Sequence, residues 1–61
     1  MYSWYEVSWK GGRTAVRAKS AEDAKRLWCN FNGYLHELPN MQVHRICDGD
    51  KEPDGYYNVI R

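Results

Sequence analysis

Two adjacent glycines, Gly11 and Gly12, separate two segments in which apolar and polar residues alternate. The first segment covers residues 2–10 and the second covers residues 13–19. Alternation with a period of two is typical of strands with one buried face, and paired glycines permit the positive φ angles of a two-residue hairpin turn. We therefore predict a β-hairpin with these two glycines in its turn.

The position of the turn decides which residues of the hairpin lie opposite each other. On the apolar face the predicted pairs are Trp9 with Thr14, Val7 with Val16, and Tyr5 with Ala18. On the other face Glu6 would oppose Arg17 as an ion pair, and Trp4 would oppose Lys19 as a cation–π pair. A slip of one residue would turn the apolar set outward, so this register is favoured.

A helix is predicted after the hairpin. Ser20 has the chemistry of an N-cap, and Asp23 three residues later approximates a capping box. Asn32 and Gly33 are typical of a helix C-terminus. Apolar residues between these ends recur at spacings of three and four, which places them on one buried stripe. The stripe consists of Ala21, Ala24, Leu27, Trp28 and Phe31.

Two more strands are predicted at residues 41–47 and 56–60, on either side of a polar turn at 48–55. The alternation in the third strand is imperfect, so we expect a bulge near Arg45. The connection 34–40 is too apolar for a free linker, and we expect it to fold over the edge of the core.

These elements predict a single α+β domain covering residues 1–61, with a two-layer ββαββ architecture. The expected sheet is antiparallel with strand order 2-1-3-4, and the helix packs on one of its faces. The other face would then be open to solvent or to a partner. The predicted core consists of Tyr5, Val7, Trp9, Val16, Ala18, Ala24, Leu27, Trp28, Phe31, Val43 and Ile46.

Length and charge restrict the class of function. A chain of 61 residues has room for one domain, and a domain this small rarely encloses a pocket. The net charge of +1 argues against a polyanion-coating protein, but residues 1–31 carry +3 and residues 32–61 carry −2. No apolar stretch approaches the ~20 residues of a membrane span, and the residues after Met1 do not form a secretory signal. We expect a cytoplasmic protein without a membrane partner.

The residues that could support metal binding or catalysis do not form a recognised pattern. Soft metal ligands are limited to Cys29, His36, His44 and Cys47. His44 and Cys47 have the spacing of half a zinc site, but no second pair completes it. A catalytic set of Cys29, His44 and Asp48 has no support in the local sequence, and the acidic turn lacks the central glycine of a calcium loop. We predict no cofactor, no metal and no enzymatic activity, and a zinc-dependent or thiol enzyme is the weakest alternative.

The outer face of the predicted hairpin combines aromatic and basic side chains. The residues expected to contact a partner are Tyr2, Trp4, Lys10, Arg13, Arg17 and Lys19. Trp, Tyr and Arg are enriched at the centres of protein interfaces, which predicts a protein-binding module. Aromatic rings among basic residues also stack bases and hold phosphates, so a nucleic-acid-binding domain is the alternative. A homodimer through the predicted edge strand 13–19 or through the open face would enlarge a small core.

Residues 5–28, with the sequence YEVSWKGGRTAVRAKSAEDAKRLW, resemble the opening of small accessory proteins of bacteriophages and mobile genetic elements. Those proteins begin with a strand, a glycine turn, a second strand and a helix that starts Ser-Ala-Glu-Asp-Ala. The resemblance covers less than half of the chain and implies no catalytic residues. It implies an accessory role in the cytoplasm of a bacterial host, such as inhibition of a host enzyme or a defence complex.

Overall fold

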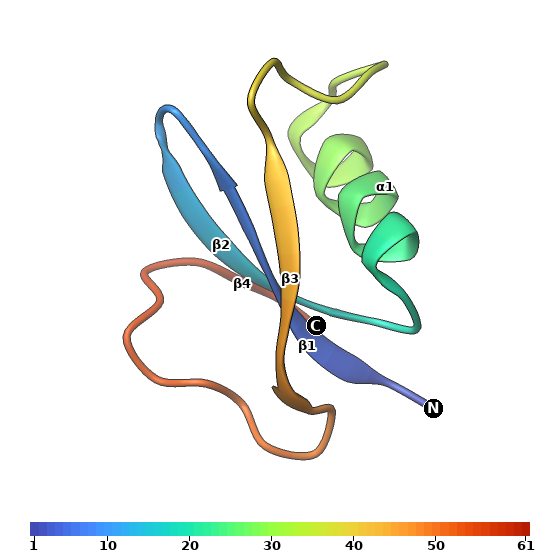
Figure 1. The fold of residues 1–61 in the computed structure, drawn as a ribbon, viewed down its shortest axis with the longest axis vertical. Coiled ribbons are helices and arrows are strands. Elements are labelled where there is room, and N and C mark those ends of the chain that lie inside the picture. The colour runs from blue at the N-terminus through green and yellow to red at the C-terminus, as the bar shows by residue number, and fades with distance from the viewer.

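Strands β1 (Ser3–Trp9) and β2 (Gly12–Ala18) form the predicted antiparallel hairpin in the computed structural model, which describes residues 1–61 (Figure 1). Its turn consists of Lys10 and Gly11, so Trp9 lies opposite Gly12. The observed pairs also include Val7 with Thr14, Tyr5 with Val16, Glu6 with Ala15 and Trp4 with Arg17. The predicted register is therefore wrong by two residues, while every side chain keeps its predicted face because strands alternate with a period of two.

The Trp9 ring explains why glycine is needed in the turn at position 11. A Cβ atom at Gly11 would lie 2.6 Å from Trp9 Nε1, so the ring packs where a side chain would otherwise be. Gly12 is the first residue of β2 and has a φ of 148°, a value that L residues rarely adopt. Glycine is therefore needed at position 11 because of the packing of Trp9, and at position 12 because of the backbone angle. The turn itself contains only the first of the two glycines.

Helix α1 (Ala21–Asn32) has the predicted ends. Ser20 Oγ accepts a hydrogen bond from the Asp23 backbone N–H at 3.1 Å, which confirms the N-cap. Gly33 adopts the left-handed conformation with φ of 78° and ends the helix. The helix has 12 residues, and neither its length nor its apolar content allows it to span a membrane.

Strands β3 (Gln42–Asp48) and β4 (Val59–Ile60) complete a four-stranded sheet with the order β3-β1-β2-β4. The placement of β1 between β2 and β3 is confirmed, as is a bulge next to Arg45, where the β1–β3 register shifts. The predicted position of the fourth strand is wrong. Strand β4 pairs in parallel with β2 at Ala15 and Val16, so the sheet is mixed and the predicted order 2-1-3-4 does not form.

The path of the chain explains this correction. Strands β2 and β3 are both antiparallel to β1 and so run in the same direction. Residues 49–58 leave β3 at one edge and must cross a sheet face to reach β2 at the other side (Figure 1). Because α1 packs on one face, this crossing segment, residues 49–58, takes the second face. The prediction that the second face is open is therefore wrong.

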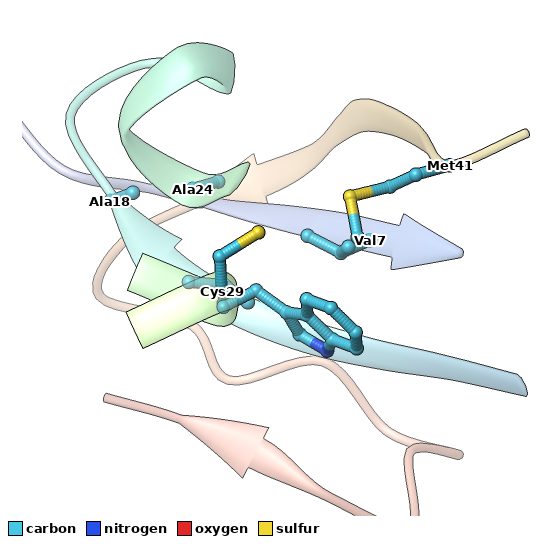
Figure 2. Close-up of a cluster of buried hydrophobic side chains, with 7 residues drawn as sticks. Val7, Ala18, Ala24, Cys29 and Met41 are labelled. Atoms are coloured by element: carbon cyan, nitrogen blue, oxygen red, sulfur yellow. The ribbon is translucent and has the colours of Figure 1, made fainter. Parts of the chain in front are cut away.

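The core lies between α1 and the first face of the sheet (Figure 2). Its buried members are Val7, Val16, Ala18, Ala24, Trp28, Cys29 and Met41. Four further predicted core residues, Tyr5, Trp9, Leu27 and Val43, are partly buried and pack against this cluster. Ile46 is also only partly buried. The prediction for Phe31 is wrong, because its side chain is 73% exposed.

Candidate partner-binding site

The six residues predicted to contact a partner do not form one surface. Trp4 is 2% exposed and belongs to the buried layer on the second face, so its prediction as a surface anchor is wrong. Lys10 lies in the hairpin turn and Arg13 lies close to it on β2. Tyr2, Arg17 and Lys19 come together at the opposite end of the hairpin. Sequence reasoning missed the burial of Trp4 because the crossing segment that covers it is distant in sequence.

Tyr2 organises the basic residues at its end of the hairpin. The Arg17 guanidinium carbon lies 4.4 Å from the centre of the Tyr2 ring, and Lys19 Nζ lies 5.6 Å from it. These are cation–π distances. Arg17 Nε also donates a hydrogen bond to the Gly49 carbonyl at 2.8 Å, which fixes the guanidinium against the crossing segment. The predicted pairing of Lys19 with Trp4 is thus replaced by a contact with Tyr2.

An open groove of about 730 Å³ lies beside this cluster, between the end of the hairpin and the first turns of α1. Four basic residues line it, namely Arg17, Lys19, Arg26 and Arg61, together with two acidic residues, Glu22 and Asp23. We call it the cationic groove. Arg26 and Arg61 were missed by sequence reasoning, because only the packing of α1 and β4 brings them to the hairpin.

The charges of the cationic groove are only partly neutralised. Arg26 forms an ion pair with Asp23, and Arg61 forms one with Glu52 at 2.7 Å. Arg17 and Lys19 form no ion pair with any carboxylate. The Arg26 guanidinium also lowers the pKa of the Asp23 carboxyl by hydrogen bonding. The groove therefore has two cations without an ion pair, Arg17 and Lys19, against one such carboxylate, Glu22, and this surplus of positive charge can attract a negatively charged group.

A second charged cluster lies around Glu6 on the second face. Glu6 accepts a hydrogen bond from the Tyr56 hydroxyl at 2.6 Å and another from Arg13 at 3.3 Å, and His44 Nε2 lies 3.7 Å away. The Tyr56 bond is the largest cause of a lowered pKa at Glu6. Burial, followed by the bond to Glu6, raises the pKa of Tyr56 to about 12. This cluster holds the crossing segment in place. Glu6 forms its ion pair with Arg13 instead of with Arg17, so the predicted Glu6–Arg17 pair is wrong and Arg13 is engaged within the fold.

The cysteines and histidines are spread over the fold. Cys29 is buried, with its Sγ 3.8 Å from the His36 carbonyl oxygen, whereas Cys47 Sγ donates to the Lys51 carbonyl at 3.1 Å. His44 lies beside Glu6 instead of beside a thiol. No group of three or more His, Cys, Asp or Glu side chains is placed to hold a metal ion. The absence of enzymatic activity stays a prediction.

An uncharged groove of about 190 Å³ lies between the last turn of α1 and the β2–β4 edge of the sheet. Its apolar lining is Trp9, Phe31, Val59 and Ile60, and we call it the aromatic groove. Phe31 lines this groove together with both residues of the short strand β4, and its side chain stays 73% exposed. The helical periodicity of the sequence could not show this, because it does not report the length of the strand beneath the helix.

Comparison of the chain with protein-family models, curated proteins and solved structures finds no match. The resemblance of residues 5–28 to accessory proteins of bacteriophages and mobile elements stays a prediction. The function is therefore inferred from the geometry of the chain's own side chains.

Proposed function

We propose that this chain is a non-enzymatic protein-binding module that takes an acidic segment of its partner into the cationic groove. The observation that carries this proposal is the pair Arg17 and Lys19, which line the groove without any carboxylate partner. Acidic side chains would form charge-assisted hydrogen bonds with these two cations.

Arg17 is held in position before a partner arrives. The Tyr2 ring and the Gly49 carbonyl both contact its guanidinium, so little side-chain freedom is lost when a carboxylate binds. The guanidinium keeps further N–H donors in a planar fork that suits a carboxylate. The open shape of the groove suits an extended polypeptide better than a small molecule, which usually binds in an enclosed pocket.

A role as an inhibitor of a bacterial host enzyme or defence complex is compatible with this mode of binding. Covering an acidic surface of a partner blocks that surface and requires no catalytic residue. The resemblance of residues 5–28 to phage and mobile-element proteins implies such a role, and the bacterial cytoplasm would be its site of action.

A nucleic acid is the alternative partner, and the groove suits it less well. Affinity for a phosphate backbone depends on the number of phosphates neutralised, and only two cations are free here. Base stacking needs an uncovered ring, whereas Arg17 lies over the Tyr2 ring. A protein partner can add contacts outside the groove, so it depends less on these two charges.

Calorimetric titration with an oligoglutamate peptide tests the proposal, with an oligoglutamine peptide and an oligothymidylate of equal length as comparisons. Lys19→Gln and Lys10→Gln form a matched pair, because both side chains are exposed lysines but only Lys19 lines the groove. We expect Lys19→Gln to weaken oligoglutamate binding roughly fivefold to tenfold, or about 1–1.4 kcal/mol. Lys10→Gln should bind like the unmodified chain.

Three results would count against the acidic-segment proposal. One is the absence of oligoglutamate binding at low salt, and another is an equal loss of affinity in both lysine variants. The third is tighter binding of oligothymidylate than of oligoglutamate, with a steep salt dependence that Lys19→Gln reduces. That third result would favour the nucleic-acid alternative.

A further inference from the structure

The aromatic groove exposes large apolar side chains that the fold does not cover. Phe31 is 73% exposed and lines the groove together with Trp9, Val59 and Ile60. Three polar residues, Thr14, Asn32 and Asn58, complete its wall. An apolar centre with a polar rim is the usual composition of a protein interface.

No charged residue lines the aromatic groove, although 28% of the chain is charged. This property matters for self-association, because a two-fold interface places the same patch of both copies in contact. The cationic groove has a net positive lining, with four basic and two acidic residues, so such a contact would bring a surplus of like charge together. The aromatic groove can face a copy of itself without that repulsion.

The two edges of the sheet also differ in their readiness to pair. Strand β4 is one edge, and its two residues, Val59 and Ile60, are both apolar. Strand β3 is the other edge, and it carries His44, Arg45 and a bulge. Charged residues and bulges discourage strand pairing at β3. Strand β4 is short, which limits the number of hydrogen bonds it can offer, but neither of its residues is charged and it carries no bulge, so β4 is the edge more open to a second chain.

From these observations we infer that the aromatic groove is a homodimer interface. Strand β4 of each copy pairs antiparallel with β4 of the other across a two-fold axis, and each Phe31 ring fills the groove of the opposite copy. This places the dimer contact on an edge that the sequence did not predict, because β2 lies inside the sheet.

The inference goes beyond the proposed function and does not depend on it. Arg61 follows β4 directly and lines the cationic groove, so the two sites adjoin there. The Tyr2 end of the groove lies at the end of β1 opposite Trp9, and dimerisation leaves that end accessible. The dimer would then present two cationic grooves, and a partner with two acidic segments would bind it more tightly than a partner with one.

Sedimentation velocity over a wide range of protein concentration tests the dimer, using Phe31→Ser and Leu35→Ser. Leu35 is the matched control because it is 93% exposed and does not line the groove. We expect the unmodified chain and Leu35→Ser to dimerise with equal affinity. Phe31→Ser should raise the dissociation constant of the dimer by about tenfold or more, as expected for an interface centre. Lys19→Gln should leave dimerisation unchanged, which separates this test from that of the proposed function.

Tryptophan emission gives a second measurement. Trp4 and Trp28 are each 2% exposed, whereas Trp9 is partly exposed and lines the groove. Acrylamide should therefore quench Trp9 less as concentration rises in the unmodified chain, but not in Phe31→Ser. A monomer at every concentration would overturn the inference, as would dimers that Phe31→Ser and Leu35→Ser weaken equally.

Discussion

The Tyr56 hydroxyl donates a hydrogen bond to Glu6 Oε2 across 2.6 Å and joins the crossing segment to the middle of β1. The two residues are 50 positions apart in the chain. The crossing segment that this bond secures also supplies the Gly49 carbonyl that holds Arg17. The geometry of the cationic groove therefore depends on a contact made outside it.

Removal of the Tyr56 hydroxyl should destabilise the fold. Tyr56→Phe keeps the ring but leaves the largely buried Glu6 carboxylate without this donor, which should lower the free energy of unfolding by about 1–2 kcal/mol. Urea denaturation measures the change. Tyr57→Phe is the control, because Tyr57 is 99% exposed and should change stability by no more than about 0.5 kcal/mol. Equal effects of the two substitutions would contradict the role assigned to Tyr56.

Glu6 should make the fold sensitive to acid. Its pKa in the folded chain is lowered from the ordinary value of 4.5, chiefly by the Tyr56 hydrogen bond. A lowered pKa means that the unfolded chain binds a proton more readily than the folded chain. The stability that Glu6 contributes is therefore present above pH 4.5 and is lost as pH falls through the lower pKa of the folded state.

Glu6→Gln tests this acid dependence, because glutamine cannot titrate. Denaturation midpoints measured over the acid range should fall less steeply in Glu6→Gln than in the unmodified chain. If the denaturation midpoints of the two proteins fall equally steeply with decreasing pH, Glu6 does not contribute to acid unfolding.

Trp4 should act as a structural residue on the second face. Trp4→Ala should lower the free energy of unfolding by about 3–5 kcal/mol, which is a large part of the stability of a small domain. Trp4→Phe should cost less, because it keeps a ring and removes a buried Nε1 that has no hydrogen-bond partner. The melting temperatures of both variants are measured by circular dichroism. Phe31→Ala is the comparison, because the Phe31 side chain is mostly exposed. If Trp4→Ala melts like Phe31→Ala, the second face is not covered as described.

Gly49 should tolerate no side chain. A Cβ atom there would lie 2.6 Å from the Tyr2 carbonyl oxygen, to which the Gly49 N–H donates at 3.0 Å. Gly49→Ala should therefore lower the free energy of unfolding by about 1–2 kcal/mol. It should also weaken oligoglutamate binding, because Tyr2 and Arg17 would shift. Asp50→Ala, at an exposed neighbouring position, should leave stability nearly unchanged. Unchanged stability and binding in Gly49→Ala would contradict the proposed coupling.

The features that the sequence predicted correctly depend on local chemistry. Alternation assigned the faces of the hairpin, and Ser20 and Gly33 marked the two ends of the helix. The hairpin register could not be decided in the same way. Turns at residues 10–11 and 11–12 both use glycine and give the same face to every side chain, so only the packing of Trp9 on Gly11 distinguishes them.

The features that were missed depend on contacts between distant parts of the chain. The pairing of β4 with β2 requires the crossing segment to traverse the second face, and nothing local to residues 56–60 reports it. The same crossing buries Trp4 and brings Arg61 to the cationic groove. Three of the six predicted contact residues, Tyr2, Arg17 and Lys19, nevertheless line the cationic groove, because these residues are in or next to the hairpin.

The central claim is that the cationic groove receives an acidic polypeptide segment, and amide chemical-shift mapping during an oligoglutamate titration tests it most directly. The account predicts shifts concentrated at Tyr2, Arg17, Lys19 and the first turn of α1, with Lys10 and Arg13 nearly unaffected. Shifts centred on Lys10 and Arg13, or no localised shifts at all, would contradict it.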